Sequence, residues 1–262
     1  KKSLLELFHL MGQNASEKFP IIGRLAQRAE NEVLRLHPEI LTISPTLKNR
    51  LQSITPNANV HLVYTGVNNN CFQSQGKEQD YILYFGRLDI HTKGLDVLFE
   101  AMKKLSAKNM RLILAGKGTP EREHTLRKMA TSFGISQQIE FFGAASEEER
   151  NRLMSEALFV CMPSRYEGWG IVAIEAGAAK TAVIGTNISG LRDAIRHNET
   201  GLLVKPEDPN SLAIAMKQLL ENPTKRQEMG QNGYRWAKQF TWEGIAKNQE
   251  TVYKSICESR SH

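Results

Sequence analysis

The chain has 262 residues, 40% of them hydrophobic, which is enough to form a hydrophobic core without covalent crosslinks. Its three cysteines, Cys71, Cys161 and Cys257, are odd in number and far apart, so the sequence argues against a disulfide framework or a Cys-x-x-Cys zinc site and favours a reducing cytoplasm. A formal charge of +6 favours anionic partners, among them nucleotides, acidic lipid surfaces and nucleic acid, without choosing between them.

No apolar stretch approaches the ~20 residues that a membrane-spanning helix needs, and the first ten residues lack the pattern of a cleavable signal. The seven histidines are scattered without a His-x-x-x-His pair, so no metal site is expected. We therefore expect a cytoplasmic protein, either soluble or bound peripherally at the inner face of the membrane.

Residues 1–70 differ in pattern from the rest of the chain. Residues 1–37 are expected to be helical and basic on one face, and they are followed by a strand over 40–44, a helix over 45–53 and a strand over 60–64. One strand–helix–strand unit cannot form a stable sheet by itself. We therefore interpret residues 1–70 as the end of a larger N-terminal domain, and the turn-rich segment 68–80 as a linker.

Residues 71–240 alternate short β-branched or aromatic runs with amphipathic segments, which is typical of a doubly wound α/β domain with a parallel sheet. Strands are expected over 81–85, 111–115, 138–142, 158–162 and 182–185. Helices are expected over 95–105, 120–133, 146–157, 170–179, 190–196, 209–221 and 223–239. Residues 241–262 form a last segment, with a cap at Thr241-Trp242 and a helix to about residue 256 that is expected to pack toward the N-terminal domain.

The stretch PSRYEGWGIVAIEA at 163–176 leaves a predicted strand, crosses a Gly-rich turn and opens a helix. Gly168 and Gly170 allow the backbone to approach a ligand, and the N–H groups at the start of a helix attract phosphate. Glu167 and Glu175 lie at most ~12 Å apart at the helical rise, a span that suits one carboxylate on a sugar ring and the other on a ribose. Each glutamate alone would fit a structural role, as a charge beside a helix N-terminus or as the partner of a lysine. Their combination with the glycines favours a ligand site.

This strand, turn and helix resemble the Glu-x7-Glu signature of GT-B glycosyltransferases, in particular the retaining family 4, also called glycosyltransferases group 1. The resemblance extends to YFGRLDIHTKGL at 84–95, LILAGKG at 112–118, FFG at 141–143, SGLRD at 189–193 and TGLLVKP at 200–206. It covers residues from about 40 to 253, and several motifs in the right order are more specific than any one. It implies a Rossmann-like donor-binding domain, preceded by part of a Rossmann-like acceptor domain.

The resemblance also implies roles for particular residues. Arg87 and Lys93, after a strand end, would hold the diphosphate and stabilise its growing charge as the sugar departs. Glu167 would bind hydroxyls of the transferred sugar, and Glu175 the ribose. The catalytic residues implied are Glu167, Arg87 and Lys93, and the donor-binding residues are Gly86, Arg87, Lys93, Gly116, Gly143, Gly168, Trp169, Gly170, Ile171 and Glu175. A metal-independent hexosyltransferase without a cofactor is expected.

The sequence departs from the family pattern after Glu175. Relatives usually have Gly-x-Pro before the next strand, whereas this chain has Lys180-Thr181-Ala182, so the turn must form without either special residue. The usual Gly-Gly turn is Ser189-Gly190 here.

Other nucleotide-binding classes fit less well. Gly116-Lys117-Gly118 is followed by Glu121 where a dinucleotide-binding fingerprint needs its third glycine. Neither Gly76-Lys77 nor Gly116-Lys117 is followed by Ser or Thr, as a P-loop requires. Nucleic-acid binding is not expected, because aromatic residues are not interleaved with basic ones.

Two functions remain open from the sequence. The first is a retaining glycosyltransferase that takes its sugar from a UDP-, GDP- or ADP-linked donor and gives it to a glycan, lipid or small-molecule acceptor. The second is a non-catalytic nucleotide-sugar-binding module that needs a separate acceptor domain or subunit, in which case the chain by itself would bind a donor and turn over poorly.

Overall fold

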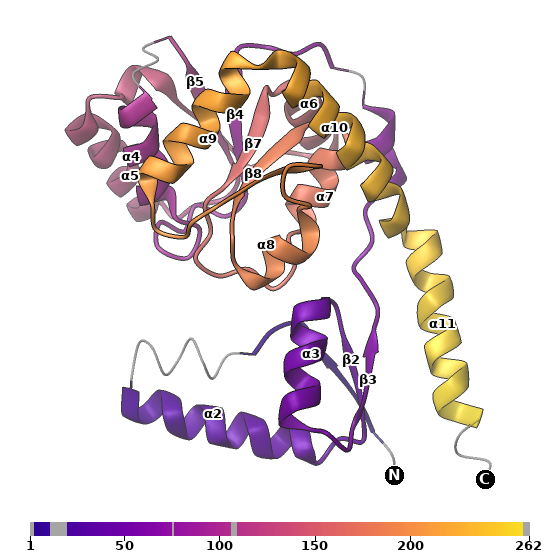
Figure 1. Cartoon of the computed structure of the whole chain (residues 1–262). Coiled ribbons are helices and arrows are strands. Elements are labelled where there is room, and N and C mark those ends of the chain that lie inside the picture. Colours follow the sequence, from indigo (N-terminus) through magenta and orange to yellow (C-terminus); the bar gives the residue numbers. More distant parts are fainter. Residues whose placement is uncertain (1–2, 11–19, 75, 106–108, 259–262) are drawn as a thin grey trace. The chain divides into compact units, whose positions relative to one another are not determined.

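The computed structural model describes residues 3–10, 20–74, 76–105 and 109–258. The chain divides into two compact units, which are described separately (Figure 1). The first contains the residues up to Gly66 together with those from Trp242 onward, and the second is Val67–Thr241. The sequence placed the boundaries at 70/71 and 240/241, within a few residues of these.

The second unit contains a six-stranded sheet whose strands all run parallel. The strands are β4 (Tyr81–Phe85), β5 (Arg111–Ala115), β6 (Ile139–Gly143), β7 (Phe159–Met162), β8 (Ala182–Thr186) and β9 (Gly201–Val204), in the spatial order β6-β5-β4-β7-β8-β9. Strand order reverses between β4 and β7, which is the topological switch point of a doubly wound sheet. The predicted α/β fold is therefore confirmed.

Helices cover both faces of this sheet (Figure 1). Right-handed connections place the helices of the β4–β6 half and those of the β7–β9 half on opposite faces. Accordingly α4 packs against α5, and α7 packs against α8. Helices α6 and α10 also pack against α7, whereas α9, which follows β9, packs against α4. The bounds are α4 (Leu95–Leu105), α5 (Pro120–Phe133), α6 (Glu147–Glu156), α7 (Ile171–Ala178), α8 (Ser189–Ala194), α9 (Pro209–Glu221) and α10 (Pro223–Ala237), with the 3-10 helices η2 (Ser136–Gln138) and η3 (Lys238–Phe240) between them.

Local sequence signals account for most helix ends. Thr119 caps α5 ahead of Pro120, and Gly134 ends that helix in the left-handed conformation at φ 71°. Ser146 and Glu149 form a reciprocal capping box at the start of α6. At the departure from the family pattern, Lys180 adopts a φ of 62°, a conformation that usually favours glycine.

Strand β9 is not among the strands expected from the sequence, which gave residues 200–206 only as a family motif. The strand is short and lies at the edge of the sheet, where Val183–Thr186 of β8 pair with Gly201–Val204. A four-residue strand carries little periodicity of its own, so its partner decides its conformation.

The first unit corrects the prediction that residues 1–37 are helical. Leu4–Leu7 form strand β1, which pairs in parallel with β2 (Glu39–Thr42), and β2 pairs with β3 (Asn59–Leu62). Only α2 (Pro20–Arg35) is a helix in this range, and residues 11–19 lie outside the described part of the chain. Leu-rich β1 has weak strand propensity, and its conformation follows from its partner β2.

Two helices complete this unit. Ser44 caps α3 (Pro45–Ile54), and Leu47 and Leu51 of this helix are buried with Ile40 of β2. The last helix, α11 (Trp242–Glu258), packs Ile245 against Leu41 and Val63 in a second small core.

The sequence was interpreted as a linker over residues 68–80, but part of this segment packs against the second unit. Residues Asn69–Gln73 form the 3-10 helix η1, and Cys71 in it is buried, with its thiol 3.5 Å from Asn151 Oδ1 of α6. Val67 donates its N–H to Phe240 O at 2.7 Å. These contacts attach the segment to the second unit.

Candidate active site

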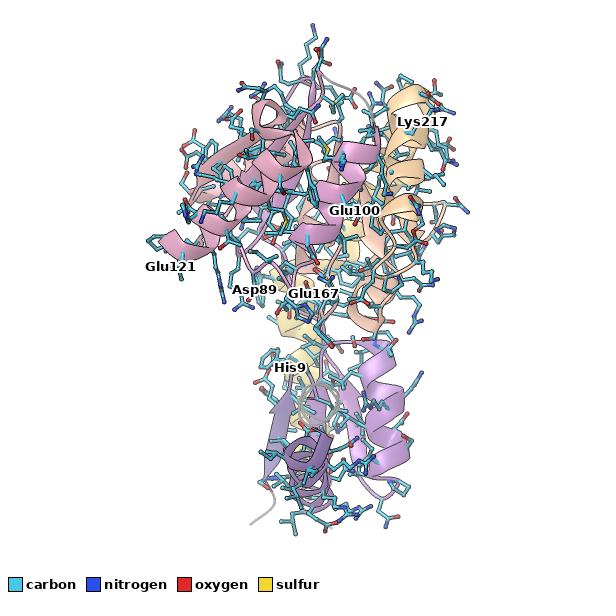
Figure 2. The ribbon with its side chains drawn as sticks, turned by 90° about the vertical axis from the view of Figure 1, so that its left-hand side faces the viewer. His9, Asp89, Glu100, Glu121, Glu167 and Lys217 are labelled. Carbon is cyan, nitrogen blue, oxygen red and sulfur yellow. The ribbon has the colours of Figure 1, made fainter. Side chains whose placement is uncertain are left out.

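A cavity of about 140 Å³ lies at the switch point of the six-stranded sheet. It is lined by the end of β4, the loop after it, the end of β7 and the start of α7, namely Tyr84, Phe85, Gly86, Arg87, Lys93, Met162, Ser164, Glu167, Ile171 and Val172. Figure 2 shows Asp89 and Glu167 at this same edge of the second unit. Ligands of open α/β sheets bind in the crevice at the carboxyl ends of the strands. The cavity brings together five residues predicted from sequence: Gly86, Arg87, Lys93, Glu167 and Ile171.

An ion pair forms the centre of this cavity. Lys93 Nζ lies 2.7 Å from Glu167 Oε2, and the two side chains are 16% and 17% exposed. The residues are 74 positions apart in the sequence, so only the parallel arrangement of β4 and β7 brings them together. In one small cavity, the cation can bind a phosphate while the neighbouring carboxylate accepts a hydrogen bond from a sugar hydroxyl.

Arg87 is exposed at the mouth of the same cavity. Its carbonyl accepts a 2.6 Å hydrogen bond from the hydroxyl of Tyr84, a buried residue on β4. Burial raises the pKa of the Tyr84 hydroxyl above its ordinary range, with the nearby carboxylate of Glu167 as a further cause, so this hydroxyl stays protonated and keeps donating. The main chain of Arg87 is therefore held in place by this hydrogen bond.

Gly86, Gly116 and Gly143 end three adjacent strands, and only Gly86 lines the cavity. Gly86 donates its N–H to Ala115 O at 2.9 Å, and Gly116 donates to Gly143 O at 2.7 Å. Gly116 has a φ of 146°, and a Cβ there would lie 1.9 Å from Gly86 O. Gly116 therefore allows the backbones that follow β4 and β5 to approach closely.

Gly116→Ala is expected to destabilise the second unit more than Gly143→Ala. Gly143 also has a positive φ, 84°, but a Cβ there would meet nothing within 4 Å, so its replacement costs only the left-handed backbone, about 1–2 kcal/mol. Gly116→Ala adds a steric clash worth about 1–3 kcal/mol. Denaturant unfolding of the two variants measures the difference, and equal stabilities would contradict the assignment.

In the turn before α7, two backbone N–H groups donate to carbonyl oxygens of the protein itself. Gly170 donates its N–H to Gly190 O at 3.2 Å, and Ile171 donates to Trp169 O at 2.8 Å. A Cβ on Gly190 would lie 2.3 Å from Glu167 O, so Gly190 allows the two loops to touch. The amides of Gly170 and Ile171, expected to face a diphosphate, are thus directed at protein carbonyls.

The side chain of Trp169 belongs to the core of the second unit. It is 5% exposed, and its ring centroid lies 5.5 Å from that of Phe240. The ring of Trp169, which the resemblance implied to be donor-binding, therefore packs in the core. Gly168 next to it is half-buried.

Glu175 does not line the cavity, and lies on α7 against α6. Its carboxylate is 3.0 Å from Arg150 Nη1, and its side chain is 12% exposed. Burial raises the pKa of Glu175, while the charge of Arg150 opposes this shift. The lysine partner considered from the sequence is an arginine here, and Arg150 also reaches Cys71 Sγ at 3.5 Å.

Sequence reasoning missed three residues at this edge of the sheet. Tyr84 and Ser164 line the cavity, and Ser164 O accepts a 2.5 Å hydrogen bond from the Thr186 hydroxyl. Arg165 makes several contacts that are described below. Ser164 and Arg165 directly follow a predicted strand, and this position was the signal that could have identified them.

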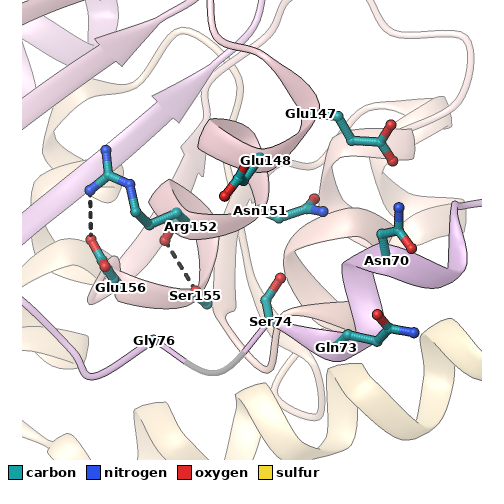
Figure 3. A pocket seen from close by; sticks show the side chains of 10 residues that line it. All are labelled: Asn70, Gln73, Ser74, Gly76, Glu147, Glu148, Asn151, Arg152, Ser155 and Glu156. Carbon is teal, nitrogen blue, oxygen red and sulfur yellow. Dashed lines mark hydrogen bonds and ion pairs between the residues drawn. The ribbon is translucent and has the colours of Figure 1, made fainter.

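A second cavity, of about 670 Å³, lies along α6 and the segment 70–76 (Figure 3). Its walls are polar and include Glu147, Glu148 and Glu156, and Arg152 pairs with Glu156 at 3.2 Å. None of the predicted site residues lines it. Within the described part of the chain, no group of three His, Cys, Asp or Glu residues could hold a metal ion, and no helix is long and apolar enough to cross a membrane.

Comparison with known proteins agrees with this architecture. The sequence model of the family described as "Glycosyl transferases group 1" matches residues 68–236. The chain belongs to the group 1 glycosyltransferases. A glycosyltransferase from Methanocaldococcus jannaschii is 31% identical over 239 residues, which are 84% of this chain and 60% of that relative. This group 1 glycosyltransferase therefore spans about 60% of the length of that relative.

Solved structures show the GT-B fold in the same way. Sucrose-phosphate synthase from Thermosynechococcus elongatus is 25% identical and superposes with a TM-score of 0.86, over 98% of this chain and 68% of its own. Anabaena Alr3699/HepE, solved with UDP and glucose, is 16% identical with a TM-score of 0.82, over 98% of this chain and 72% of its own. This second likeness concerns the fold alone.

Proposed function

We propose that this chain is the donor-binding half of a retaining, family 4 glycosyltransferase that moves a hexose from a nucleoside diphosphate to an acceptor. The observation that carries the proposal is the Lys93–Glu167 ion pair beside Arg87, in a cavity at the switch point of the sheet. The cavity is smaller than the ~300–1,000 Å³ of a pocket that encloses a whole small-molecule ligand. It suits the diphosphate and sugar at the centre of a donor that extends along the sheet edge.

In this proposal the diphosphate replaces Glu167 as the partner of Lys93. Arg87 and Lys93 bind its oxygens, and the positive end of α7, near Gly168 and Gly170, adds to their field. Glu167, released from Lys93, accepts hydrogen bonds from hydroxyls of the sugar. Glu175, four residues beyond Ile171 and ~6 Å further along the helix axis, contacts the ribose hydroxyls.

The reaction breaks the bond between the anomeric carbon and the diphosphate oxygen. The electron pair leaves with the diphosphate, where Arg87 and Lys93 stabilise the new charge, so the protein cations supply the stabilisation that a metal ion gives elsewhere. The acceptor oxygen attacks the oxocarbenium-like carbon from the same face and transfers its proton to the departing diphosphate oxygen, and the anomeric configuration is retained. Closure of the donor and acceptor domains would limit hydrolysis.

The non-catalytic module is the second candidate, and it is compatible with the 60% of the Methanocaldococcus jannaschii relative that this chain spans. In that case the chain binds the donor and an acceptor domain elsewhere completes the site. A radiolabelled donor distinguishes the two, because transfer to glycan, lipid or small-molecule acceptors, or slow release of free sugar, requires catalysis. Donor binding without either product would favour the module.

A thermal-shift panel of UDP-, GDP- and ADP-sugars tests the shared part of both candidates. A ligand that binds only the folded state stabilises it by RT ln(1 + [L]/Kd), or ~2.7 kcal/mol at a concentration of 100 Kd. We expect one base to give a clear rise in Tm. No shift with any of the three donors would contradict the proposal.

We further propose a peripheral contact of the cytoplasmic enzyme with the inner face of the membrane, through helix α2. Five large apolar side chains of α2 and its end are exposed: Ile21 (79%), Ile22 (71%), Leu25 (60%), Val33 (50%) and Leu36 (78%). Their spacing places them on one side of the helix. An apolar face of this kind inserts into the boundary between headgroups and acyl chains.

Cations next to this face favour an anionic surface. Arg24, Arg28 and Arg35 belong to the same helix, and all three are exposed. Each basic residue near an anionic bilayer contributes about 1 kcal/mol. The combination of an exposed apolar face and arginines is typical of interfacial helices.

Ile22→Asp with Leu25→Asp is expected to reduce binding to phosphatidylglycerol vesicles at least ~10-fold in sedimentation assays, because two charges enter the apolar face. Ile214→Asp is the control, since Ile214 is also a large exposed apolar residue, 69% exposed, but lies on α9. Equal binding by wild type and double variant would contradict the contact, and so would a failure of the wild type to bind these vesicles.

A further inference from the structure

Arg165 connects three loops at the carboxyl edge of the six-stranded sheet. Its Nη1 and Nη2 donate to the two carboxylate oxygens of Asp96 at 2.8 and 2.7 Å. Its Nε donates to Glu207 Oε1 at 2.6 Å, and Nη1 also donates to His91 O at 2.8 Å. One side chain therefore links the loop after β7, the loop between β4 and α4, and the turn between β9 and α9.

The main chain strengthens the connection to the loop that carries Lys93. Arg165 donates its N–H to Thr92 O at 3.0 Å, and Lys93 donates its N–H to Asp89 O at 3.0 Å. The two loops touch at Gly94, where a Cβ would lie 2.0 Å from Pro163 O. A shift of the β7 loop would therefore displace Lys93.

The contacts of Arg165 stabilise an unfavourable backbone conformation at Glu207 and the ionised form of Asp96. Glu207 has a φ of 56°, a left-handed conformation that costs a non-glycine residue energy and persists only where the surroundings stabilise it. Burial favours the neutral form of Asp96, but the hydrogen bonds and charge of Arg165 outweigh burial and lower the pKa of this carboxyl. The bidentate pair is thus ionised at neutral pH and has a fixed planar geometry.

Arg165 itself is poorly placed to bind phosphate. Its side chain is 13% exposed, and three of its nitrogens already donate to two carboxylates and a carbonyl. Two neighbouring carboxylates more than balance its charge. Its contribution to the site therefore acts through the loop that it holds.

We infer that Arg165 is a positioning residue that fixes the 88–94 loop, and so places Lys93 for binding the donor diphosphate. This inference rests on the proposed function. It assigns Arg165 an effect on donor affinity, whereas an arginine that only contributes to folding would change stability alone. Lys93 Nζ must reach both Glu167 and the phosphate, and a displacement of ~1 Å in such a site is enough to cost up to ~100-fold.

The experiment compares Arg165→Ala with a matched variant, Arg226→Ala. Arg226 is also buried, at 6% exposed, and binds one carboxylate, Glu78, at 3.1 and 2.8 Å and one carbonyl, Leu219 O, at 2.7 Å. Both substitutions thus remove one guanidinium, one bidentate pair and one bond to a carbonyl, and Arg165→Ala also removes the bond to Glu207. Arg226 lies on α10 and does not line the cavity.

We expect Arg165→Ala to weaken binding of the nucleoside diphosphate by about 10–100-fold in calorimetry, and Arg226→Ala to leave it unchanged at a similar loss of Tm. Hydrogen exchange should become faster at the Lys93 amide in the first variant only. In the enzyme with its acceptor domain, KM for the donor should rise more than kcat falls. Arg165→Lys, which keeps the charge but not the bidentate geometry, should recover only part of the affinity.

Asp96→Asn provides a second route if Arg165→Ala proves too unstable to assay. It keeps the arginine but weakens the bidentate pair, and it should lower the affinity in the same direction. Unchanged affinity in Arg165→Ala, or in Asp96→Asn where that variant is used, overturns the inference, as does an equal loss in Arg226→Ala. A wild type that binds no nucleoside diphosphate overturns the proposed function instead.

Discussion

Replacing Glu167 by alanine is expected to lower the rate of sugar transfer by about 10²–10³-fold in the full-length enzyme, because the transition state loses a preorganised polar group next to the reacting carbon. The same substitution should preserve the affinity for nucleoside diphosphate or raise it. Lys93 Nζ is 2.7 Å from the Glu167 carboxylate in the structure, and without that partner it is available to phosphate. Transfer assays with labelled donor and calorimetry with the nucleoside diphosphate measure the two effects separately.

Glu140→Ala is a suitable control for this variant. It also removes the carboxylate of an ion pair, with Arg111 at 2.5 Å, but this pair lies on β5 and β6 and does not line the cavity. Its transfer rate should match that of the wild type. Unchanged transfer in Glu167→Ala, with a folded enzyme shown by its Tm, would refute the role given to this glutamate.

Removing both cations of the cavity should lower the affinity for nucleoside diphosphate, which Glu167→Ala should preserve or raise. Arg87→Ala with Lys93→Ala is expected to weaken nucleoside diphosphate binding at least ~100-fold, since a hydrogen bond to a charged group contributes about 1.5–3 kcal/mol. The loss is increased by Glu167, whose carboxylate would remain in the cavity without its ion-pair partner and would repel the phosphates. Calorimetry at fixed ionic strength measures the change, because salt screens such interactions.

The control for the double variant removes two positive charges elsewhere in the same unit. Arg152→Ala with Lys217→Ala does so on α6 and α9, where these residues pair with Glu156 and Glu221. This control should retain its affinity, which separates the local contact from the net charge of +6. Wild-type affinity in Arg87→Ala with Lys93→Ala would exclude diphosphate binding by these two residues.

The two results together distinguish the roles within one cavity. Glu167→Ala is expected to affect transfer and spare diphosphate binding, whereas the cation variant is expected to abolish binding. A single effect shared by both variants would indicate that the cavity had collapsed. This contrast is stronger than either variant alone, because Lys93 and Glu167 are in contact and their individual effects are not additive.

Several elements could be predicted from sequence because their signals are local. Helices α4 and α5 and strands β4 and β5 have the predicted bounds, and each is defined by its own periodicity, cap or turn residues. The site motif at 163–176 was recognisable for the same reason. A strand, a glycine turn and a helix follow one another within a few residues, so their order in the chain is also their order in space.

Other features could not be predicted, because another part of the chain decides them. Strand β1 was assigned to a helical segment, because four leucine-rich residues become a strand only when β2 is beside them. Glu175 lies on the predicted helix, but its ion-pair partner at 3.0 Å, Arg150, is supplied by α6. Cys71, in the segment interpreted as a linker, is buried, and its thiol lies 3.5 Å from Asn151 Oδ1 of α6.

The sequence by itself determined the α/β class, the alternation of strands and helices, and the residue types available at the end of each strand. Only the tertiary structure decided which of these residues meet. Lys93 and Glu167 are brought together by the reversal of strand order between β4 and β7, and Arg165 joins three loops that are distant in the chain. The physical reason is that strand order and register are non-local: they depend on which apolar faces pack together, which no single segment of the sequence specifies.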